Sequence, residues 1–361
     1  MAPMGNPQKT SEYLLGQCAR YPELMVQDLL KALHQSVFGC GHFVQDPQSA
    51  LRRITQELDA LSASPYETAA EPLDGAFCRL PLQYVLQHAL APKTLLRLFI
   101  LSAQPPCGSL AELEEKLAVL LGLAENGRLP FSLQDVIRAV DGWRQAGFPA
   151  CRHSARFRAA YAPAYRVIRR EYVPLLPLLA VIDQHMAQTP RLLAAIEGGS
   201  ASGKTTLAAL LQRIYDAQVF HMDDFFLRPE QRTPERLAEP GGNVDRERFF
   251  SEVLLPLSQG RTVAYRPYSC GTQSIGAPRA LPPKALNIVE GAYSMHPALA
   301  EQYGLTVFLR ICPQLQRQRI LARNTPAEAE RFFSTWIPLE ERYFEATAPQ
   351  RRCTLIWEAA E

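Results

Sequence analysis

The stretch "IEGGSASGKTTLA", residues 196–208, determines how the second half of this chain folds. Within it, Gly198 to Thr205 fits G-x-x-x-x-G-K-[ST], a phosphate-binding loop, and the apolar run "LLAAI" (192–196) stands directly before it. Glycines allow backbone N–H groups to converge on phosphate oxygens, and the N-terminus of a following helix adds its dipole. The stretch therefore predicts a strand, a nucleotide-binding loop and a helix in that order.

Each position of the loop has an expected role in holding ATP and Mg²⁺. Lys204 is expected to bridge the β- and γ-phosphates, and the Thr205 hydroxyl is placed to hold Mg²⁺. The predicted nucleotide-binding residues are Gly198, Gly199, Ser200, Ala201, Ser202, Gly203, Lys204, Thr205 and Thr206. The loop alone does not select a reaction, but no N-K-x-D segment indicates a GTPase and no L-S-G-G-Q segment indicates an ABC-type ATPase.

Around this loop, short apolar or β-branched runs alternate with helical segments. The further runs are 218–222, 262–265, 286–290, 305–311 and 354–357. Strands that alternate with helices of this length predict an α/β fold, a parallel sheet with helices on both faces. We place this P-loop domain at residues 191–361.

The first 155 residues have the pattern of successive helices. Asp46-Pro47, Ser109 with Glu112, and Ser132 with Asp135 are typical helix starts, and Gly39 stops an apolar stripe that begins at Val26. Leu110, Leu113, Leu117 and Leu121, and then Val136, Ile137 and Val140, are expected to face inward. These patterns predict an all-α domain over 1–155, of unknown role, and a helical connector over 156–190.

The composition limits the partners that we expect. A length of 361 residues suits two domains, and a net charge of +2 gives no reason to expect nucleic acid or an anionic membrane as a partner. No apolar run reaches the roughly 18 residues of a membrane helix, and the N-terminus lacks a secretory pattern. Eight cysteines without a CxxC pair favour reduced thiols and a cytoplasmic location. The oligomeric state is not indicated.

The histidines of the first half do not form a recognisable site. Cys40 and His42 in "GCGH" (39–42) have no second cluster at ligand spacing, so a turn is favoured over a metal site. His34, His88 and His153 are isolated in sequence and are interpreted as packing or surface residues.

Two adjacent aspartates in "HMDDFF" (221–226) follow the second apolar run of the α/β half. An aspartate at the carboxyl end of a strand, beside a phosphate-binding loop, lies where open α/β sheets bind ligands. If the strand continues through Met222, Asp223 and Asp224 point to opposite faces and cannot act on the same atom. The two carboxylates are therefore expected to have different roles.

Four segments together resemble the uridine kinase and phosphoribulokinase superfamily of P-loop kinases, over roughly residues 191 to 350. These segments are "GGSASGKTT", "HMDDFF", "GGNVDRERF" (241–249) and "NIVEGAYSM" (287–295), and D-D-F-F is especially similar to nicotinamide riboside kinases. The resemblance implies that Asp223 is the base for the acceptor hydroxyl and that Glu290 helps to hold the metal. A helix cap or turn at Asp223, and an acidic strand end at Glu290, are the structural alternatives.

A helix after the fifth apolar run carries two arginines four residues apart. "RQRILARN" (317–324) places Arg319 and Arg323 on one side and resembles the arginine-bearing lid of these kinases. The lid role implies contact between an arginine and the transferred phosphoryl group. A solvent-facing helix surface is the alternative.

The predicted acceptor pocket departs from the pattern of uridine kinases. The family's Y-D-F-x-x-H-x-R segment compares with "YSCGTQSI" (268–275), where Tyr268 is kept, Gln273 stands at the histidine position and Ile275 at the arginine position. The loss of two polar groups should weaken pyrimidine binding. Asp245 is expected to bind sugar hydroxyls, to cap the helix that follows, or both.

These patterns favour an ATP- and Mg²⁺-dependent kinase, similar to uridine kinase, that phosphorylates a hydroxyl of a nucleoside- or sugar-like metabolite. Metal ligands are expected from Thr205, Glu290 and Asp223. The alternatives are the same fold acting on pantothenate or a phosphopentose, and a regulatory nucleotide-binding protein with little turnover. The role of Asp224 stays open between a turn residue and a partner of metal-bound water.

Overall fold

The computed structural model describes residues 6–39, 46–62, 70–104 and 108–359. The chain divides into two compact units, Met1–Asp183 and Gln184–Glu361, which we call the N-terminal unit and the C-terminal unit. Each is considered by itself. The helix α9, Leu176–Gln188, contains the point at which the two units divide.

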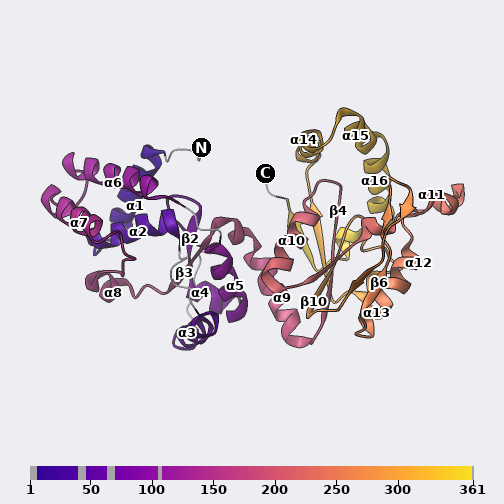
Figure 1. Cartoon of the computed structure of the whole chain (residues 1–361), viewed down its shortest axis with the longest axis horizontal. Helices are drawn as coiled ribbons and strands as arrows, with labels where there is room; N and C mark the ends of the chain where they lie inside the picture. Colours follow the sequence, from indigo (N-terminus) through magenta and orange to yellow (C-terminus); the bar gives the residue numbers. More distant parts are fainter. Residues whose placement is uncertain (1–5, 40–45, 63–69, 105–107, 360–361) are drawn as a thin grey trace. The chain divides into compact units, whose positions relative to one another are not determined.

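The C-terminal unit is built on a five-stranded parallel sheet, as predicted (Figure 1). The strand order is β12-β11-β4-β10-β5, so the strand that leads into the phosphate-binding loop lies in the middle. The strands are β4 (Leu192–Gly198), β5 (Gln218–His221), β10 (Leu286–Glu290), β11 (Leu305–Arg310) and β12 (Leu355–Glu358). The α/β fold with helices around a parallel sheet is confirmed.

The register of the three strands β4, β10 and β5 brings their carboxyl ends to one edge of the sheet. Glu290 at the end of β10 pairs with Ile196 on one side and with His221 on the other. α10, Lys204–Tyr215, connects β4 to β5 and packs against β4, β5 and β10. The phosphate-binding loop, the paired aspartates and Glu290 therefore share this edge.

Seven helices accompany α9 in the described part of the C-terminal unit. They are α10 (Lys204–Tyr215), α11 (Pro234–Ala238), α12 (Arg246–Phe249), α13 (Leu255–Ser258), α14 (Pro313–Arg323), α15 (Pro326–Arg331) and α16 (Ile337–Thr347). The helices α14, α15 and α16 follow one another at the top of this unit in Figure 1. Phe220, Phe225 and Phe249 are fully buried in a cluster that joins β5 to α12.

One segment expected in the parallel sheet lies elsewhere. β6 (Val263–Tyr265) pairs antiparallel with β9 (Arg279–Leu281), and β7 (Tyr268–Ser269) pairs with β8 (Ser274–Ile275). Val263 and Tyr265 are buried while Ala264 between them is exposed. Such alternation is typical of an antiparallel strand with one wet face, whereas parallel strands are buried on both faces. The expectation for 262–265 was therefore wrong about its partner.

The N-terminal unit is mainly helical, as predicted. Its helices are α1 (Pro7–Arg20), α2 (Val26–Phe38), α3 (Pro47–Asp59), α4 (Leu82–Gln87), α5 (Pro92–Ser102), α6 (Leu110–Glu125), α7 (Leu133–Gln145) and α8 (Ala155–Tyr161). Asp46, Ser109 and Ser132 each accept a hydrogen bond from a backbone N–H of the first turn. Gly39 ends α2 with a φ of 61°, a conformation that glycine adopts without steric cost.

A small antiparallel sheet in this unit corrects the all-α expectation. The sheet order is β1-β2-β3, with β1 at Glu71–Pro72, β2 at Phe77–Pro81 and β3 at Tyr165–Arg169. β3 comes from the segment 156–190 that was expected to be a helical connector. All five residues of β2 are buried, so the strand lacks the alternation that identifies a strand in sequence.

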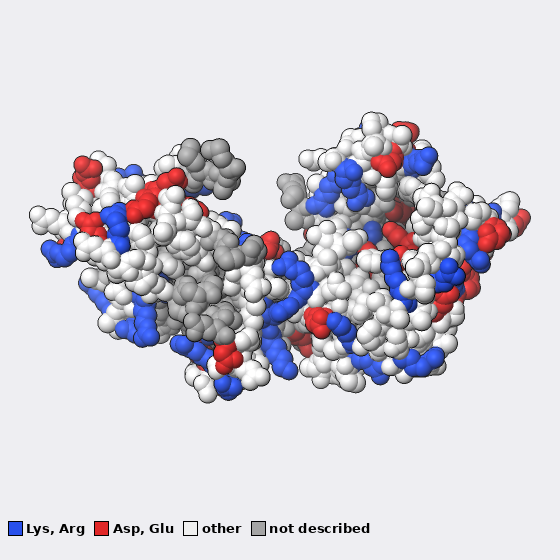
Figure 2. Space-filling model, viewed as in Figure 1, with Lys and Arg blue, Asp and Glu red and all other residues white. Residues whose placement is uncertain are grey.

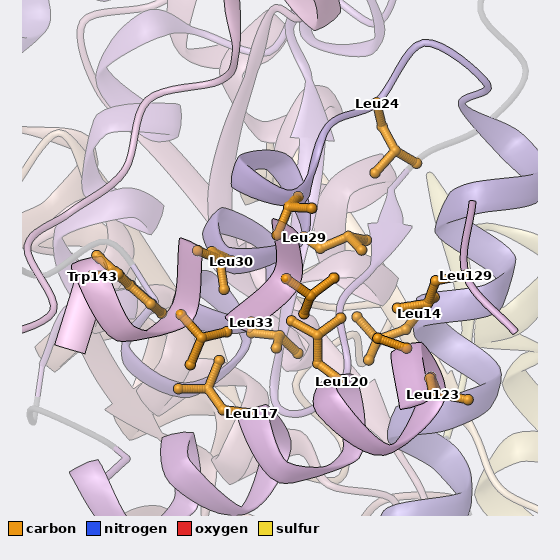
Figure 3. Close-up of a cluster of buried hydrophobic side chains, with 14 of the residues drawn as sticks. Leu14, Leu24, Leu29, Leu30, Leu33, Leu117, Leu120, Leu123, Leu129 and Trp143 are labelled. Atoms are coloured by element: carbon orange, nitrogen blue, oxygen red, sulfur yellow. The ribbon is translucent and has the colours of Figure 1, made fainter. Parts of the chain in front are cut away.

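Leucines from α1, α2 and α6 form the core of the N-terminal unit (Figure 3). Leu14, Leu33 and Leu117 have no exposed surface. Two residues expected to face inward do not do so, because Leu110 is 58% exposed and Ile137 is 41% exposed. The buried apolar face of α6 and that of α7 are therefore narrower than the sequence suggested.

Acidic and basic side chains are mixed over each unit on the face drawn in Figure 2. In the described part of the chain, no helix is both long enough and apolar enough to span a membrane. The six cysteines with a described environment are free thiols. Cys40 and His42, interpreted above as part of a turn, lie outside the described residues.

Replacement of Leu117 should reveal the strength of the leucine core. Leu117→Ala is expected to lower the free energy of unfolding by about 2–5 kcal/mol, because it removes buried methyl groups and leaves a cavity. Leu110→Ala, on the exposed side of the same helix, should change it by less than about 0.5 kcal/mol. Urea unfolding followed by circular dichroism measures both, and equal losses would contradict the assignment of the core.

Candidate functional site

The phosphate-binding loop is formed where β4 ends and α10 begins. Gly198 has a φ of 152°, and a Cβ atom there would lie 2.4 Å from the carbonyl oxygen of Leu309. Gly203 has a φ of 100° and leads directly into α10 at Lys204. Both positions need glycine, one for close backbone approach and both for a positive φ. The unit thus has a P-loop nucleotide-binding fold.

The polar groups of this loop fit a phosphate ligand. Lys204 Nζ donates hydrogen bonds of 2.9 Å to the carbonyl oxygens of Gly198 and Gly199. Ser202 Oγ is buried and has no hydrogen-bond partner among the described residues. A buried hydroxyl without a partner is costly, and a phosphate oxygen would supply one. The free N–H groups at the start of α10 favour the same negative charge.

The side chain of Thr205, in the first turn of α10, contacts Glu290 at the end of β10. The Thr205 hydroxyl lies 3.2 Å from each carboxylate oxygen of Glu290, and His221 Nδ1 lies 2.5 Å from Glu290 Oε1. The hydrogen bond to Glu290 raises the pKa of His221, against the opposing effect of burial. His221 was missed in the sequence analysis, although it is the residue that pairs with Glu290 in the sheet register.

This pair of oxygen donors suits Mg²⁺. No group of three or more His, Cys, Asp or Glu side chains that could hold a metal is present among the described residues. Mg²⁺ does not require one, because it is usually held by one or two carboxylates together with substrate phosphates and water. Thr205 and Glu290 could therefore hold the ion beside the phosphates, with Asp223 nearby.

Asp223 stands at this edge with an uncommitted carboxylate. It lies in a 3₁₀ turn, Met222–Phe225, directly after β5, and its carboxylate has no hydrogen bond to any described residue. Asp223 is exposed, but the groups around its carboxylate still displace water and raise its pKa; the charge of Lys204 lowers the pKa, and Glu290 raises it further. A carboxylate with a raised pKa is a better proton acceptor than a fully solvated one.

Asp224 has a different set of contacts. Its Oδ2 accepts hydrogen bonds from Tyr265 Oη at 2.7 Å and from Arg279 Nη1 at 2.9 Å. Asp224 therefore joins the turn after β5 to the β6–β9 hairpin. The strand ends at His221, so the premise that Asp223 and Asp224 belong to an extended strand was wrong. The side chains diverge because residues of a 3₁₀ turn are rotated by about 120° from one to the next.

The two predicted lid arginines lie in different surroundings. Arg319 on α14 donates to the Ala201 carbonyl oxygen of the phosphate-binding loop at 3.2 Å. Arg323, at the end of the same helix, stacks on the ring of Phe332 at 5.6 Å. Gln316, not identified from sequence, donates to the Ser200 carbonyl oxygen at 2.9 Å. Of the two arginines, the structure brings Arg319 to the loop.

Two buried acids that support the loop were also missed in the sequence analysis. Glu340 on α16 accepts from the backbone N–H of Ser200 at 2.8 Å and from its hydroxyl at 2.7 Å. Glu197, the last residue before the loop, accepts from the N–H groups of Tyr293 and Met295 at 2.5 and 2.6 Å. The "EGG" run places Glu197 beside the motif, but α16 carries no sequence signal that connects it to the loop.

The predicted acceptor residues are structural in their described contacts. Asp245 caps α12 through the N–H of Arg248 at 3.1 Å and also accepts from Gln231 at 2.7 Å. Tyr268 is buried, and its hydroxyl accepts from Arg232 at 3.2 Å. Gln273 is exposed in the turn between β7 and β8, with a φ of 51°. A contact between these side chains and an acceptor stays a prediction.

Comparisons with known proteins give similarity of structure only. No model of a protein family matches the chain, and no curated protein matches it. A possible uridine kinase from Bacillus stearothermophilus is 20% identical, with a TM-score of 0.37, over 49% of this chain and 99% of that one. A proposed fructose transport system kinase from Silicibacter sp. is 22% identical, with a TM-score of 0.39, over 49% and 97%. Shikimate kinase from Bacteroides thetaiotaomicron is 15% identical, with a TM-score of 0.26, over 46% and 86%. Similarity at this level carries no conclusion about activity.

The stability of the C-terminal unit should depend on the titration of Glu197. Complete burial raises the pKa of Glu197 from 4.5 to about 7, although three hydrogen bonds and Lys204 oppose the shift. The folded state therefore keeps the proton to a higher pH than the unfolded state. This contribution to stability is complete below pH 4.5 and decreases by about 3 kcal/mol as the pH rises to about 7.

Glu197→Gln removes this titration. The difference in unfolding free energy between the native chain and Glu197→Gln should shift in favour of the variant between pH 4.5 and pH 7. Urea titrations at several pH values measure it, with the exposed Glu345→Gln as a control. A difference that is independent of pH would show that Glu197 keeps an ordinary pKa in the folded state.

Proposed function

We propose that the C-terminal unit is an ATP- and Mg²⁺-dependent kinase that transfers a phosphoryl group to a hydroxyl of a nucleoside- or sugar-like metabolite, as in the uridine kinase family. The single observation that supports this most strongly is Asp223. This acidic side chain has a raised pKa and no hydrogen bond to any described residue. It is close enough for the charge of Lys204 to act on it, at the edge of the sheet where the phosphate-binding loop begins. A protein that only binds nucleotides has no need of such a group.

In the proposed reaction the acceptor hydroxyl gives its proton to the Asp223 carboxylate while its oxygen attacks the γ-phosphorus of ATP. The bond between the γ-phosphorus and the β–γ bridging oxygen breaks, and ADP leaves. Lys204 and Arg319 are the cations of this chain that would offset charge on the phosphates. Mg²⁺, which Thr205 and Glu290 would hold beside Asp223, would supply further charge neutralisation when bound.

The remaining contacts of the site fit support of the loop rather than reaction. Glu340 fixes Ser200, Gln316 fixes the Ser200 carbonyl, and His221 orients Glu290. Arg323 is held against Phe332, which favours Arg319 over Arg323 as the lid arginine. A cytoplasmic location stays a prediction made from composition. The expectation that neither nucleic acid nor a membrane is a partner also stays a prediction of this kind.

The acceptor can be identified by a direct assay. The full-length protein with ATP and Mg²⁺ is tested against uridine, cytidine, purine nucleosides, nicotinamide riboside, pantothenate, pentoses and pentose phosphates, while ADP release is followed. We expect acceptor-dependent turnover with at least one nucleoside- or sugar-like compound. Turnover only with pantothenate or a phosphopentose would favour the alternative substrates. Tight ATP binding without turnover on any compound would favour the regulatory alternative.

Replacement of Asp223 should separate chemistry from binding. Asp223→Asn is expected to lower kcat by about 10²–10⁴-fold, the usual contribution of a positioned acid or base, while the Kd for ATP stays nearly unchanged. Steady-state kinetics and calorimetry measure the two quantities.

Asp224→Asn is the matched control, because it keeps an oxygen acceptor for Tyr265 and loses only the charge toward Arg279. A loss of about tenfold or less is expected for that variant. If Asp223→Asn retains activity, or if Asp224→Asn loses more, the assignment of the base is wrong.

A further inference from the structure

The N-terminal unit contains a cavity that is separate from the phosphate-binding loop. Its volume is about 970 Å³, near the upper end of the range of small-molecule sites. α2, α3, β3 and the segment 151–153 contribute to its walls. All of the described lining residues belong to the N-terminal unit.

The cavity has an excess of positive charge. Among the described lining residues, five side chains are basic and two are acidic; the basic ones are Lys31, Arg53, Arg152, Arg158 and Arg166. Both acidic groups are already engaged. Glu57 accepts from Arg53 at 3.0 Å and from Arg166 at 2.9 Å, and Asp46 caps the start of α3.

Three of the basic groups keep unused donors. The guanidinium groups of Arg152 and Arg158 have no hydrogen bond to any described residue. Lys31 Nζ donates to the Cys151 carbonyl oxygen at 2.8 Å, its one acceptor among the residues that the structure describes. An ammonium group has three N–H donors, so two remain for a ligand. Burial and the charge of Arg79 lower the pKa of Lys31 to about 8, although Cys151 and Asp28 act in the opposite direction.

A chain of hydrogen bonds stiffens the wall beside Lys31. Asp28 Oδ1 lies 2.8 Å from His153 Nδ1, His153 Nε2 lies 2.6 Å from the Tyr165 hydroxyl, and that hydroxyl lies 3.4 Å from Gln35. Burial lowers the pKa of His153, against the hydrogen bond to Asp28, and so favours the neutral ring. Burial opposes the charge of Asp28, but hydrogen bonds from His153 and Ser154 hold its pKa at about 2. His153 therefore donates through Nδ1 and accepts through Nε2.

The hydrogen-bonded side chains of His153, Tyr165 and Gln35 thus form a polar wall of the cavity beside the cationic group of Lys31. Asp28 is not among the described lining residues, and its carboxylate is engaged in hydrogen bonds with His153 and Ser154. Its charge acts on Lys31 only as a smaller effect that opposes burial. Rigid polar walls with a few charged groups are characteristic of small-molecule sites, where they fix orientation. A ligand with one anionic end and a polar body would match both parts of the cavity.

We propose that this cavity binds a small metabolite that carries a phosphate or carboxylate group, with Lys31, Arg152 and Arg158 as the cations that recognise it. The oxyanion would accept the donors that the protein leaves unused. Charge-assisted hydrogen bonds of this kind are about twice as strong as neutral ones, so few are needed for selective binding. The site gives the N-terminal unit a ligand of its own, whatever the acceptor of the C-terminal unit.

Inorganic phosphate is the first probe. Its binding to the full-length protein is detected by broadening of the ³¹P NMR line. Because the phosphate-binding loop also binds phosphate, all measurements are made in the Lys204→Ala background. We expect saturable broadening to remain there, and to weaken about tenfold or more when Lys31→Met, or Arg152→Gln together with Arg158→Gln, is added. The two arginines are exposed, so their replacement should not disturb the fold.

Matched controls are Lys93→Met and Arg128→Gln, both exposed in the same unit and outside the cavity. These should leave phosphate binding unchanged. Displacement of phosphate by citrate would show that the cavity also binds carboxylates. Failure of citrate to compete would restrict the proposed ligands to phosphates. The proposal is overturned if Lys204→Ala alone abolishes the broadening, or if both cavity variants bind phosphate as well as the controls do.

Discussion

The buried carboxylate of Glu197 is the constraint on which the phosphate-binding site depends. It joins three segments that are distant in sequence: the end of β4, the turn after β10 through the N–H groups of Tyr293 and Met295, and α16 through the hydroxyl of Tyr343 at 3.1 Å. A carboxylate without partners in this position would cost several kcal/mol, so the three segments must close around it together. Once α16 is held there, Glu340 reaches Ser200 and fixes the loop itself. The shape of the loop thus depends on contacts with α16 as well as on its own glycines.

The parts of the site that could be predicted from sequence are those with local causes. The P-loop needs glycines at fixed positions. Acidic residues at the ends of parallel strands lie together at one edge of the sheet. Glu340 and Gln316 could not be found in this way. They reach Ser200 from 140 and 116 residues further along the chain, and an acid or an amide on a helix has no pattern that marks such a contact.

The difference between local and distant causes also explains which elements of the N-terminal unit could be predicted. Helices with a capping residue and an apolar stripe, such as α6 and α7, were placed correctly because both signals lie within one turn. The sheet was not predicted, because β2 and β3 come from segments about 90 residues apart and β2 is buried on both sides. Arg79 in the middle of β2 also makes the strand hard to recognise in the sequence, because its buried guanidinium depends on Gln35, Glu71 and the Tyr165 ring, which come from other elements.

The two aspartates show how charge is divided at the edge of the sheet. Arg279 and Tyr265 compensate Asp224, so the negative charge of that residue is bound to the hairpin and exerts less repulsion on its neighbour. Asp223 has no hydrogen-bond partner among the residues that the structure describes, and its pKa is influenced mainly by lost hydration, by Lys204 and by Glu290. If both carboxylates were free, each would oppose the ionisation of the other, and neither would have a defined direction. The ion pair at Asp224 therefore leaves the carboxylate of Asp223 available for the role of proton acceptor that we propose for it, and the 3₁₀ turn after β5 supplies the divergence that an extended strand was expected to give.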